Sequence, residues 1–130
     1  MSRTNTKIKR SMKRLVKWVE IPAGNFDRAV KFYESILETQ MEKIECDYEK
    51  MACLPGNEGA ISFADGFKPS ADGVLVSLDA GNDIDSMINR VRSAGGAITT
   101  PKTKIEAEGH GWFAVFTDSE GNRLGLYGDK

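Results

Sequence analysis

The stretch WVEIPAGN, residues 18–25, predicts a β-strand that leads directly into a helix. The strand pattern covers residues 15–21, is rich in β-branched and aromatic side chains, and closes at Pro22, which cannot donate a hydrogen bond to a continuing sheet. Asn25 is a favourable N-cap, because its side chain can accept a hydrogen bond from the first helical turn. The letters AGN return at residues 80–82, so the chain contains this junction twice.

Each junction is followed by an amphipathic helix pattern. Apolar residues recur at three- and four-residue intervals from Phe26 to Leu37, which places them in one stripe on a helix. Asn82 is the expected second N-cap, and a similar stripe runs from Ile84 to Ala94 before a Gly-Gly pair typical of a helix end.

Short strand patterns complete each half of the chain. Those of the first half are residues 40–46, 51–54 and 60–64; the second half opens with 73–78 and closes with 97–105, 112–117 and 122–127. We therefore predict an α+β fold of two tandem βαβββ modules, at about 15–66 and 72–128. Neither is long enough to close a core alone, so both pack as a single domain over 15–130.

Charge separates the first residues from this domain. Seven of the 18 Lys and Arg residues lie within residues 1–17, whereas all 19 acidic residues lie from Glu20 onward. We interpret residues 1–14 as a basic N-terminal extension. A basic arm can contact nucleic acid or an anionic membrane. This one lacks interleaved aromatic residues, which favours a solvated leader instead.

No apolar run approaches the ~20 residues needed to cross a bilayer, and no signal-peptide pattern is present. We therefore expect a cytoplasmic protein whose two cysteines stay reduced.

Three stretches carry a family resemblance: EIPAGNFDRAVKFY at 20–33, VLVSLDAGNDID at 74–85 and FTDSEGNRLGLYG at 116–128. They resemble the vicinal oxygen chelate superfamily, which includes glyoxalase I, bleomycin-resistance proteins and extradiol dioxygenases. The resemblance implies that the two modules form a curved mixed sheet, a cup, with the helices on its outer face. Function does not follow from such a fold.

Metal-dependent members of that superfamily hold a divalent ion with four side chains drawn from the first and last strands of each module. By the resemblance, those positions fall here on Trp18, Ser62, Gly73 and Gly125. A divalent ion needs imidazole or carboxylate donors, and none of the four supplies one. A slip of one residue would bring in Val19 or Glu20 and still leave the ligand set incomplete. We expect no metal and no other cofactor.

Alternation along the strands assigns side chains to the two faces of the sheet. Those expected toward the helices are Val19, Ile21, Ile61, Phe63, Val74, Val76, Leu78, Leu124 and Leu126. Those expected on the opposite face include the candidate ligand-binding residues Trp18, Ser62, Leu75, Arg123 and Tyr127, together with Glu20. That face is either a binding cup or the wetter side of an antiparallel sheet.

Two residues are candidates for catalysis. Glu20 can serve as a general base or bind a cationic group; a structural salt bridge to Arg123 is the alternative. His110 can overhang the mouth of the cup and titrate near neutrality, or be an exposed bystander. Trp18 places an aromatic wall, suited to a flat or apolar ligand, where a metal ligand would stand.

The leading hypothesis is a glyoxalase-like, bleomycin-resistance-like protein that binds a small organic molecule without metal; conversion of that molecule stays open. The alternative is a metal-dependent lyase or isomerase similar to glyoxalase I, and a third is an interaction protein using the basic extension. We expect a small-molecule ligand and a homodimer, and neither membrane nor nucleic acid as partner.

Deleting residues 1–11, so that Met12 starts the chain, should change the free energy of unfolding little, because the segment supplies almost no apolar side chains for burial. Denaturant unfolding of both forms measures this. A loss of several kcal/mol would show instead that the extension docks on the domain.

Overall fold

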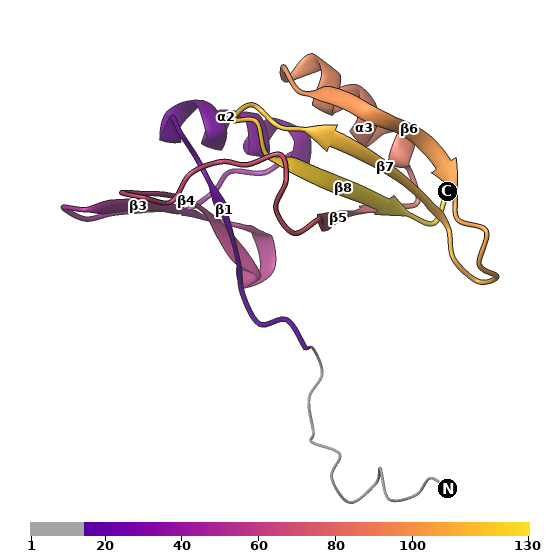
Figure 1. The fold of residues 1–130 in the computed structure, drawn as a ribbon, viewed down its shortest axis with the longest axis horizontal. Coiled ribbons are helices and arrows are strands. Elements are labelled where there is room, and N and C mark those ends of the chain that lie inside the picture. The colour runs from indigo at the N-terminus through magenta and orange to yellow at the C-terminus, as the bar shows by residue number, and fades with distance from the viewer. Residues whose placement is uncertain (1–14) are drawn as a thin grey trace, which may run out of the picture.

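The computed structural model describes residues 15–130; the basic extension 1–14 lies outside them. Two four-stranded sheets, with strand orders β1-β4-β3-β2 and β5-β8-β7-β6, carry both helices on one common side (Figure 1). In each sheet the first and last strands of the module are parallel neighbours, and the other pairs are antiparallel. The predicted duplication of a βαβββ module is therefore confirmed.

The elements follow the same order in both modules. The first has β1 (Val19–Pro22), α2 (Phe26–Leu37), β2 (Lys43–Glu45), β3 (Glu49–Cys53), the short 3-10 turn η1 (Pro55–Asn57) and β4 (Gly59–Ala64). The second has β5 (Val76–Gly81), α3 (Ile84–Ser93), β6 (Ala97–Lys104), β7 (Trp112–Thr117) and β8 (Arg123–Gly128). No helix in the described part of the chain is long and apolar enough to span a membrane.

The opening strands are shorter at their N-terminal ends than predicted. β1 begins at Val19, four residues later than expected, and Leu15 is 87% exposed. The reason is that β1 pairs only with β4, whose first paired residue, Gly59, lies opposite Val19. β5 likewise begins at Val76, where its pairing with β8 starts. A strand extends only as far as its partner.

The N-cap of α3 lies one residue later, relative to the repeated Ala-Gly-Asn sequence, than the N-cap of α2. Asn25 caps α2 as predicted, with its side chain accepting the Arg28 N–H at 3.0 Å. The prediction for Asn82 is wrong: Asp83 is the N-cap of α3, and its Oδ1 accepts the Ser86 N–H at 3.1 Å. Asn and Asp are both favourable N-caps. Which of the two residues caps α3 therefore depends on where β5 ends.

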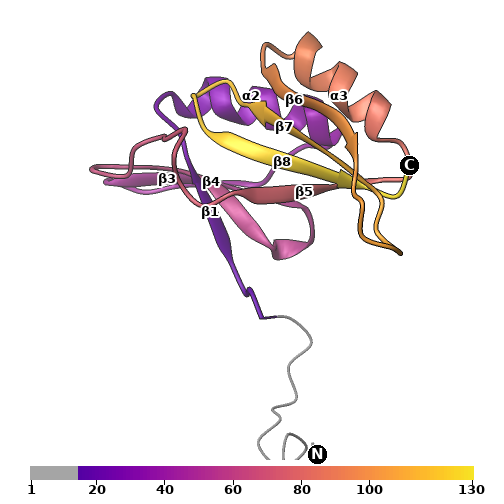
Figure 2. The same ribbon diagram turned by 45° about the vertical axis from the view of Figure 1, so that its right-hand side comes forward.

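The core lies between the helices and the sheets (Figure 2). Tyr33 and Phe116 are fully buried in it. Of the predicted helix-facing residues, Val19, Val76 and Leu78 are half-buried, and two are exposed. Phe63 is 39% exposed because it lies beside the first turn of α2, which covers only part of its ring, and Val74 is 89% exposed because it precedes β5.

The turn between β7 and β8 joins the two modules through buried hydrogen bonds. Tyr33 of α2 donates its hydroxyl to Asp118 Oδ2 at 2.5 Å, and Asn122 Nδ2 donates to the Pro22 carbonyl at 2.8 Å and to Asp118 Oδ2 at 3.0 Å. Burial and the neighbouring Asp118 carboxylate raise the pKa of Tyr33 well above 10.0, so its phenol remains a proton donor. We call residues 118–122 the clamp turn.

Glu120 of the clamp turn binds the start of α2. Its Oε1 accepts the N–H groups of Gly24 at 2.9 Å and Asn25 at 2.7 Å, and its Oε2 accepts Arg28 Nε at 2.7 Å. Burial on its own raises the pKa of Glu120, but hydrogen bonds from Arg28, Asn25 and Ser119 outweigh it and leave the pKa below the ordinary 4.5. The ionised carboxylate therefore stabilises the folded state.

Glu120→Gln should lower the free energy of unfolding by about 1–3 kcal/mol at neutral pH, because charged hydrogen bonds are lost. The folded-state pKa lies below the unfolded one. The stability that ionised Glu120 contributes is therefore present above about pH 4.5 and is lost as the pH falls through the folded value. Denaturant unfolding across a pH series should show the gap between wild type and variant narrowing in acid.

Glu38→Gln is the matched control. Glu38 also forms an ion pair, with its Oε1 3.5 Å from Arg90 Nη1, but its side chain is exposed to solvent, so the pair contributes little stability. It should change stability little at any pH. A Glu120→Gln effect that stays constant into acid would contradict the ionisation argument.

Candidate functional site

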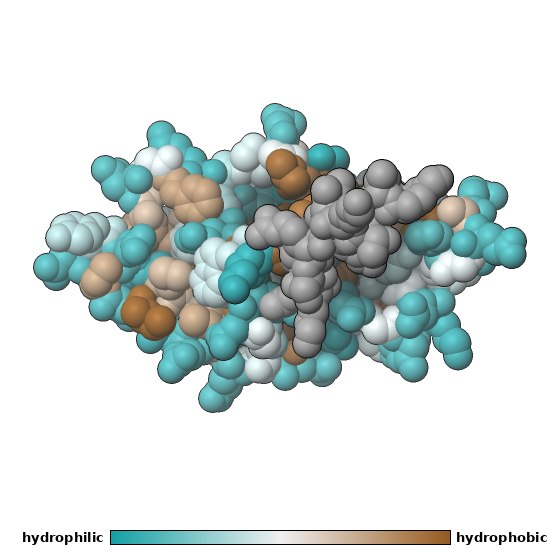
Figure 3. Space-filling model, turned by 90° about the horizontal axis from the view of Figure 1, so that it is seen from below, coloured by the Kyte–Doolittle hydropathy of each residue, from teal (hydrophilic) through white to brown (hydrophobic). Residues whose placement is uncertain are grey.

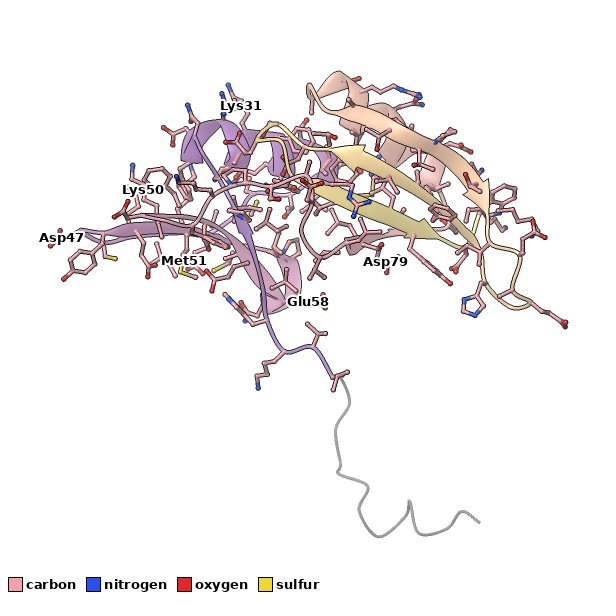
Figure 4. All side chains as sticks on the ribbon, in the orientation of Figure 1. Lys31, Asp47, Lys50, Met51, Glu58 and Asp79 are labelled. Carbon is pink, nitrogen blue, oxygen red and sulfur yellow. The ribbon has the colours of Figure 1, made fainter. Side chains whose placement is uncertain are left out.

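Figure 3 shows the molecule from the side of the sheets away from the helices, where both apolar and polar residues reach the surface in the left part of the view. The structure confirms the predicted alternation in β1 and β4: Ile21 and Ile61 are buried under the helices, whereas Glu20 and Ser62 share the other face. Met51 lies opposite Ser62 and Asp79 opposite Tyr127 in strand register, and Figure 4 shows Met51 and Asp79 on the side away from the helices.

A cavity of about 280 Å³ lies between the two modules. One wall is β1, another is formed by the starts of β5 and β8, and the connector after β4 closes it. It exists because β1 and β5 are edge strands that pair with β4 and β8 and not with each other. Ile21, Leu124 and Phe67 supply apolar surface, while Glu20 and Arg123 add opposite charges.

Glu20 and Arg123 line the same cavity without forming the salt bridge that sequence reasoning offered as one alternative. Within the described chain, no ion pair or hydrogen bond joins them. The Glu20 carboxylate instead accepts the Ser62 hydroxyl at 2.7 Å through Oε1. Ser62 is 1% exposed, so this bond satisfies a buried hydroxyl, and Glu20 Oε2 has no hydrogen-bond partner among the described residues.

His110 and Tyr127 form a separate pair at the far end of β8. His110 Nδ1 lies 2.8 Å from Tyr127 Oη, and the two rings meet edge to face at 6.5 Å. Tyr127 follows Arg123 by four residues, which corresponds to roughly 13 Å along a strand. It lines a different hollow, with Ser77 and Asp79. The structure therefore does not bring His110 and Glu20 together within one chain.

The remaining predicted ligand-binding residues flank the cavity. Trp18 directly precedes β1 and is 40% exposed, and Leu75 directly precedes β5 and is 43% exposed; neither is among the residues that line it. Sequence reasoning missed Phe67, Lys68 and Ser70, which do line it. They lie in the connector between the modules, where no periodic pattern signals which way a side chain points. An aromatic residue beside a lysine was the only hint.

The four family metal positions do not fit a divalent ion. The Ser62 hydroxyl is already bound to Glu20, and Gly73 lines the cavity without a donor side chain. A Cβ added at Gly125 would collide with the Ser77 side chain. A metal-binding side chain at position 125 is therefore excluded unless Ser77 moves. No group of three or more His, Cys, Asp or Glu side chains in residues 15–130 is arranged to hold a metal.

Comparison with known proteins identifies the family. The model of the Glyoxalase/Bleomycin resistance protein/Dioxygenase superfamily matches residues 15–126, and the chain belongs to this superfamily. No curated protein matches the chain.

Several solved structures share the fold. A glyoxalase/bleomycin resistance protein/dioxygenase domain from Frankia sp. EAN1pec is 20% identical, with a TM-score of 0.68 over 92% of this chain and 100% of that one. A variant of the fosfomycin resistance protein FosX from Listeria monocytogenes, complexed with Mn(II) and a dihydroxypropylphosphonic acid, is 16% identical, with a TM-score of 0.64 over 89% and 90%. A maize glyoxalase I variant is 19% identical, with a TM-score of 0.67 over 88% of this chain and 44% of that one.

Ser62→Asp tests the second metal position directly. The new carboxylate would be buried beside Glu20, and without a cation it should lower the free energy of unfolding by about 3 kcal/mol or more. Ser62→Ala should cost only about 1 kcal/mol, because exposed Glu20 can bind water instead. Unfolding in the presence of a chelator measures both. An aspartate variant as stable as wild type would contradict this account of the position.

Proposed function

We propose that this chain is a metal-independent binding protein for a small organic molecule, in the manner of bleomycin-resistance proteins, and that the cavity between the modules is its binding site. The single observation that carries the proposal is the composition of that cavity. It combines apolar walls with charged groups that form no ion pair within residues 15–130, as ligand sites do, whereas the positions that the resemblance assigns to a metal lack donors.

The residues divide into two roles. Ile21, Leu124 and Phe67 exclude water from one side of the ligand, and Arg123 and Glu20 orient its polar groups. Trp18 and Leu75 lie next in sequence to the strands that line the cavity, and in this proposal they contact the part of the ligand that projects from it. If the ligand is also converted, Glu20 is the base, because its Oε2 accepts no hydrogen bond from the described residues and can take a proton.

His110 and Tyr127 have a part only where a second copy brings them to the site. We propose a homodimer in which the second copy covers the open face. Support comes from large apolar side chains that one chain leaves exposed, such as Val74 at 89% and Ile44 at 53%. Light scattering after size-exclusion chromatography measures the mass in solution and so tests for the dimer.

We also propose a cytoplasmic location. The two free thiols, Cys46 and Cys53, suit this reducing compartment.

The purified protein should contain no stoichiometric zinc, nickel, manganese or iron, and a chelator should leave its melting temperature unchanged, because the donor set does not fit. Elemental analysis and thermal unfolding measure this. One tightly bound divalent ion per chain would overturn the proposal in favour of a lyase similar to glyoxalase I.

A thermal-shift screen of small organic molecules tests the site itself, since a ligand that binds only the folded state raises the melting temperature. Gly73→Phe should abolish the shift of every true ligand. Gly73 lines the cavity and a Cβ there meets no atom within 4 Å, so the position accepts a side chain, and we expect the ring to occupy the cavity. Ala71→Phe is the control, as Ala71 is exposed nearby but does not line the cavity. Ligands that survive Gly73→Phe bind elsewhere and contradict the assignment.

A further inference from the structure

Two cations line the cavity without a partner in the described chain. Lys68 and Arg123 make no ion pair and no side-chain hydrogen bond within residues 15–130, although residues 18–130 carry an excess of acidic side chains. Not every cation of the domain is free in this way: Arg28 binds Glu120 at 2.7 Å, and Lys102 binds Asp85 at 3.0 Å. Lys68 and Arg123 are therefore free to bind an external anion.

The connector that carries Lys68 is held on both sides. Before Lys68, the Phe67 N–H donates to the Ala64 carbonyl at 3.1 Å, which makes a turn at the end of β4. After it, the Ser70 N–H donates to Asn122 Oδ1 at 3.0 Å, and Asn122 is the residue immediately before Arg123. The clamp turn thus holds the backbone beside both cations at one cavity before any ligand arrives, which lowers part of the entropic cost of binding.

The surroundings limit what the anion can be. Phe67 and Val74 line the cavity and are 38% and 89% exposed, so they offer apolar surface to a ligand, and part of the ligand should be apolar. The planar guanidinium of Arg123 suits a carboxylate or phosphonate, and Lys68 adds a point charge. Glu20 on the same cavity repels a second negative charge.

From these observations we propose that the cavity binds a small monoanionic organic acid with an apolar body, its acid group between Lys68 and Arg123. This rests on the proposed function, because it assigns the chemical class of the ligand for the same site. The two anion-binding residues lie outside the positions that the resemblance assigns to a metal: Lys68 belongs to the connector, and Arg123 is the first residue of β8.

The test compares 4-fluorobenzoate with its neutral isostere 4-fluorobenzamide, each titrated into the full-length protein and followed by ¹⁹F NMR. The carboxylate should bind and the amide should bind roughly tenfold more weakly or not at all. Arg123→Gln and Lys68→Gln should each weaken the carboxylate roughly tenfold and leave the melting temperature unchanged, because both side chains are exposed. Lys104→Gln is the control, an exposed lysine on β6 away from the cavity.

Each outcome separates the two proposals. If both probes bind equally and Gly73→Phe abolishes both, the cavity is a ligand site but the inferred acid recognition is wrong. If 4-fluorobenzoate binds and Gly73→Phe leaves it bound, neither proposal holds for this cavity. If neither probe binds, the inference fails, and the proposed function is then decided by the thermal-shift screen. Equal losses in Lys104→Gln and Arg123→Gln would show nonspecific charge attraction and overturn the inference.

Discussion

The hydrogen bonds of the clamp turn hold the two modules together. Asp118 and Asn122 are 4% and 5% exposed, and their side chains bind partners from the first module and its connector as well as each other and backbone N–H groups of the turn. Pulling the modules apart would break the hydrogen bonds that Tyr33, Ser70 and Pro22 make with the turn, and each such bond typically contributes about 1 kcal/mol or more. A short polar turn can therefore fix the relation of two sheets that share no strand pairing.

The cavity is a consequence of that constraint. β1 and β5 each use one edge for pairing within their own sheet, and the clamp turn holds the two free edges at a set separation. Side chains at the starts of β8 and β5 then fill only part of the space. Because Asn122 also holds the connector through Ser70, the same residue that joins the modules positions one wall of the site.

Membership of the superfamily defines the scaffold and leaves its chemistry open. A serine, a tryptophan and two glycines occupy the positions that the sequence resemblance aligns with metal ligands of the family, and at one of them Ser62 binds Glu20. The polar groups available to a ligand belong to the junction between the modules. The proposed binding function fits this junction, because the cavity there combines charged side chains with apolar ones.

The sequence by itself determined the duplicated βαβββ order, the helix stripes, the Asn25 cap and the alternation of Ile21 with Glu20, because periodicity and capping are local properties. Tertiary structure decided where β1 and β5 begin, because each strand starts where its pairing with the partner strand starts. It also made Asp83, and not Asn82, the N-cap of α3. It also decided that Glu20 binds Ser62 and not Arg123, that His110 lies apart with Tyr127, and that Lys68 joins the cavity. Those outcomes depend on which side chains reach each other across the junction, and no linear pattern encodes that distance.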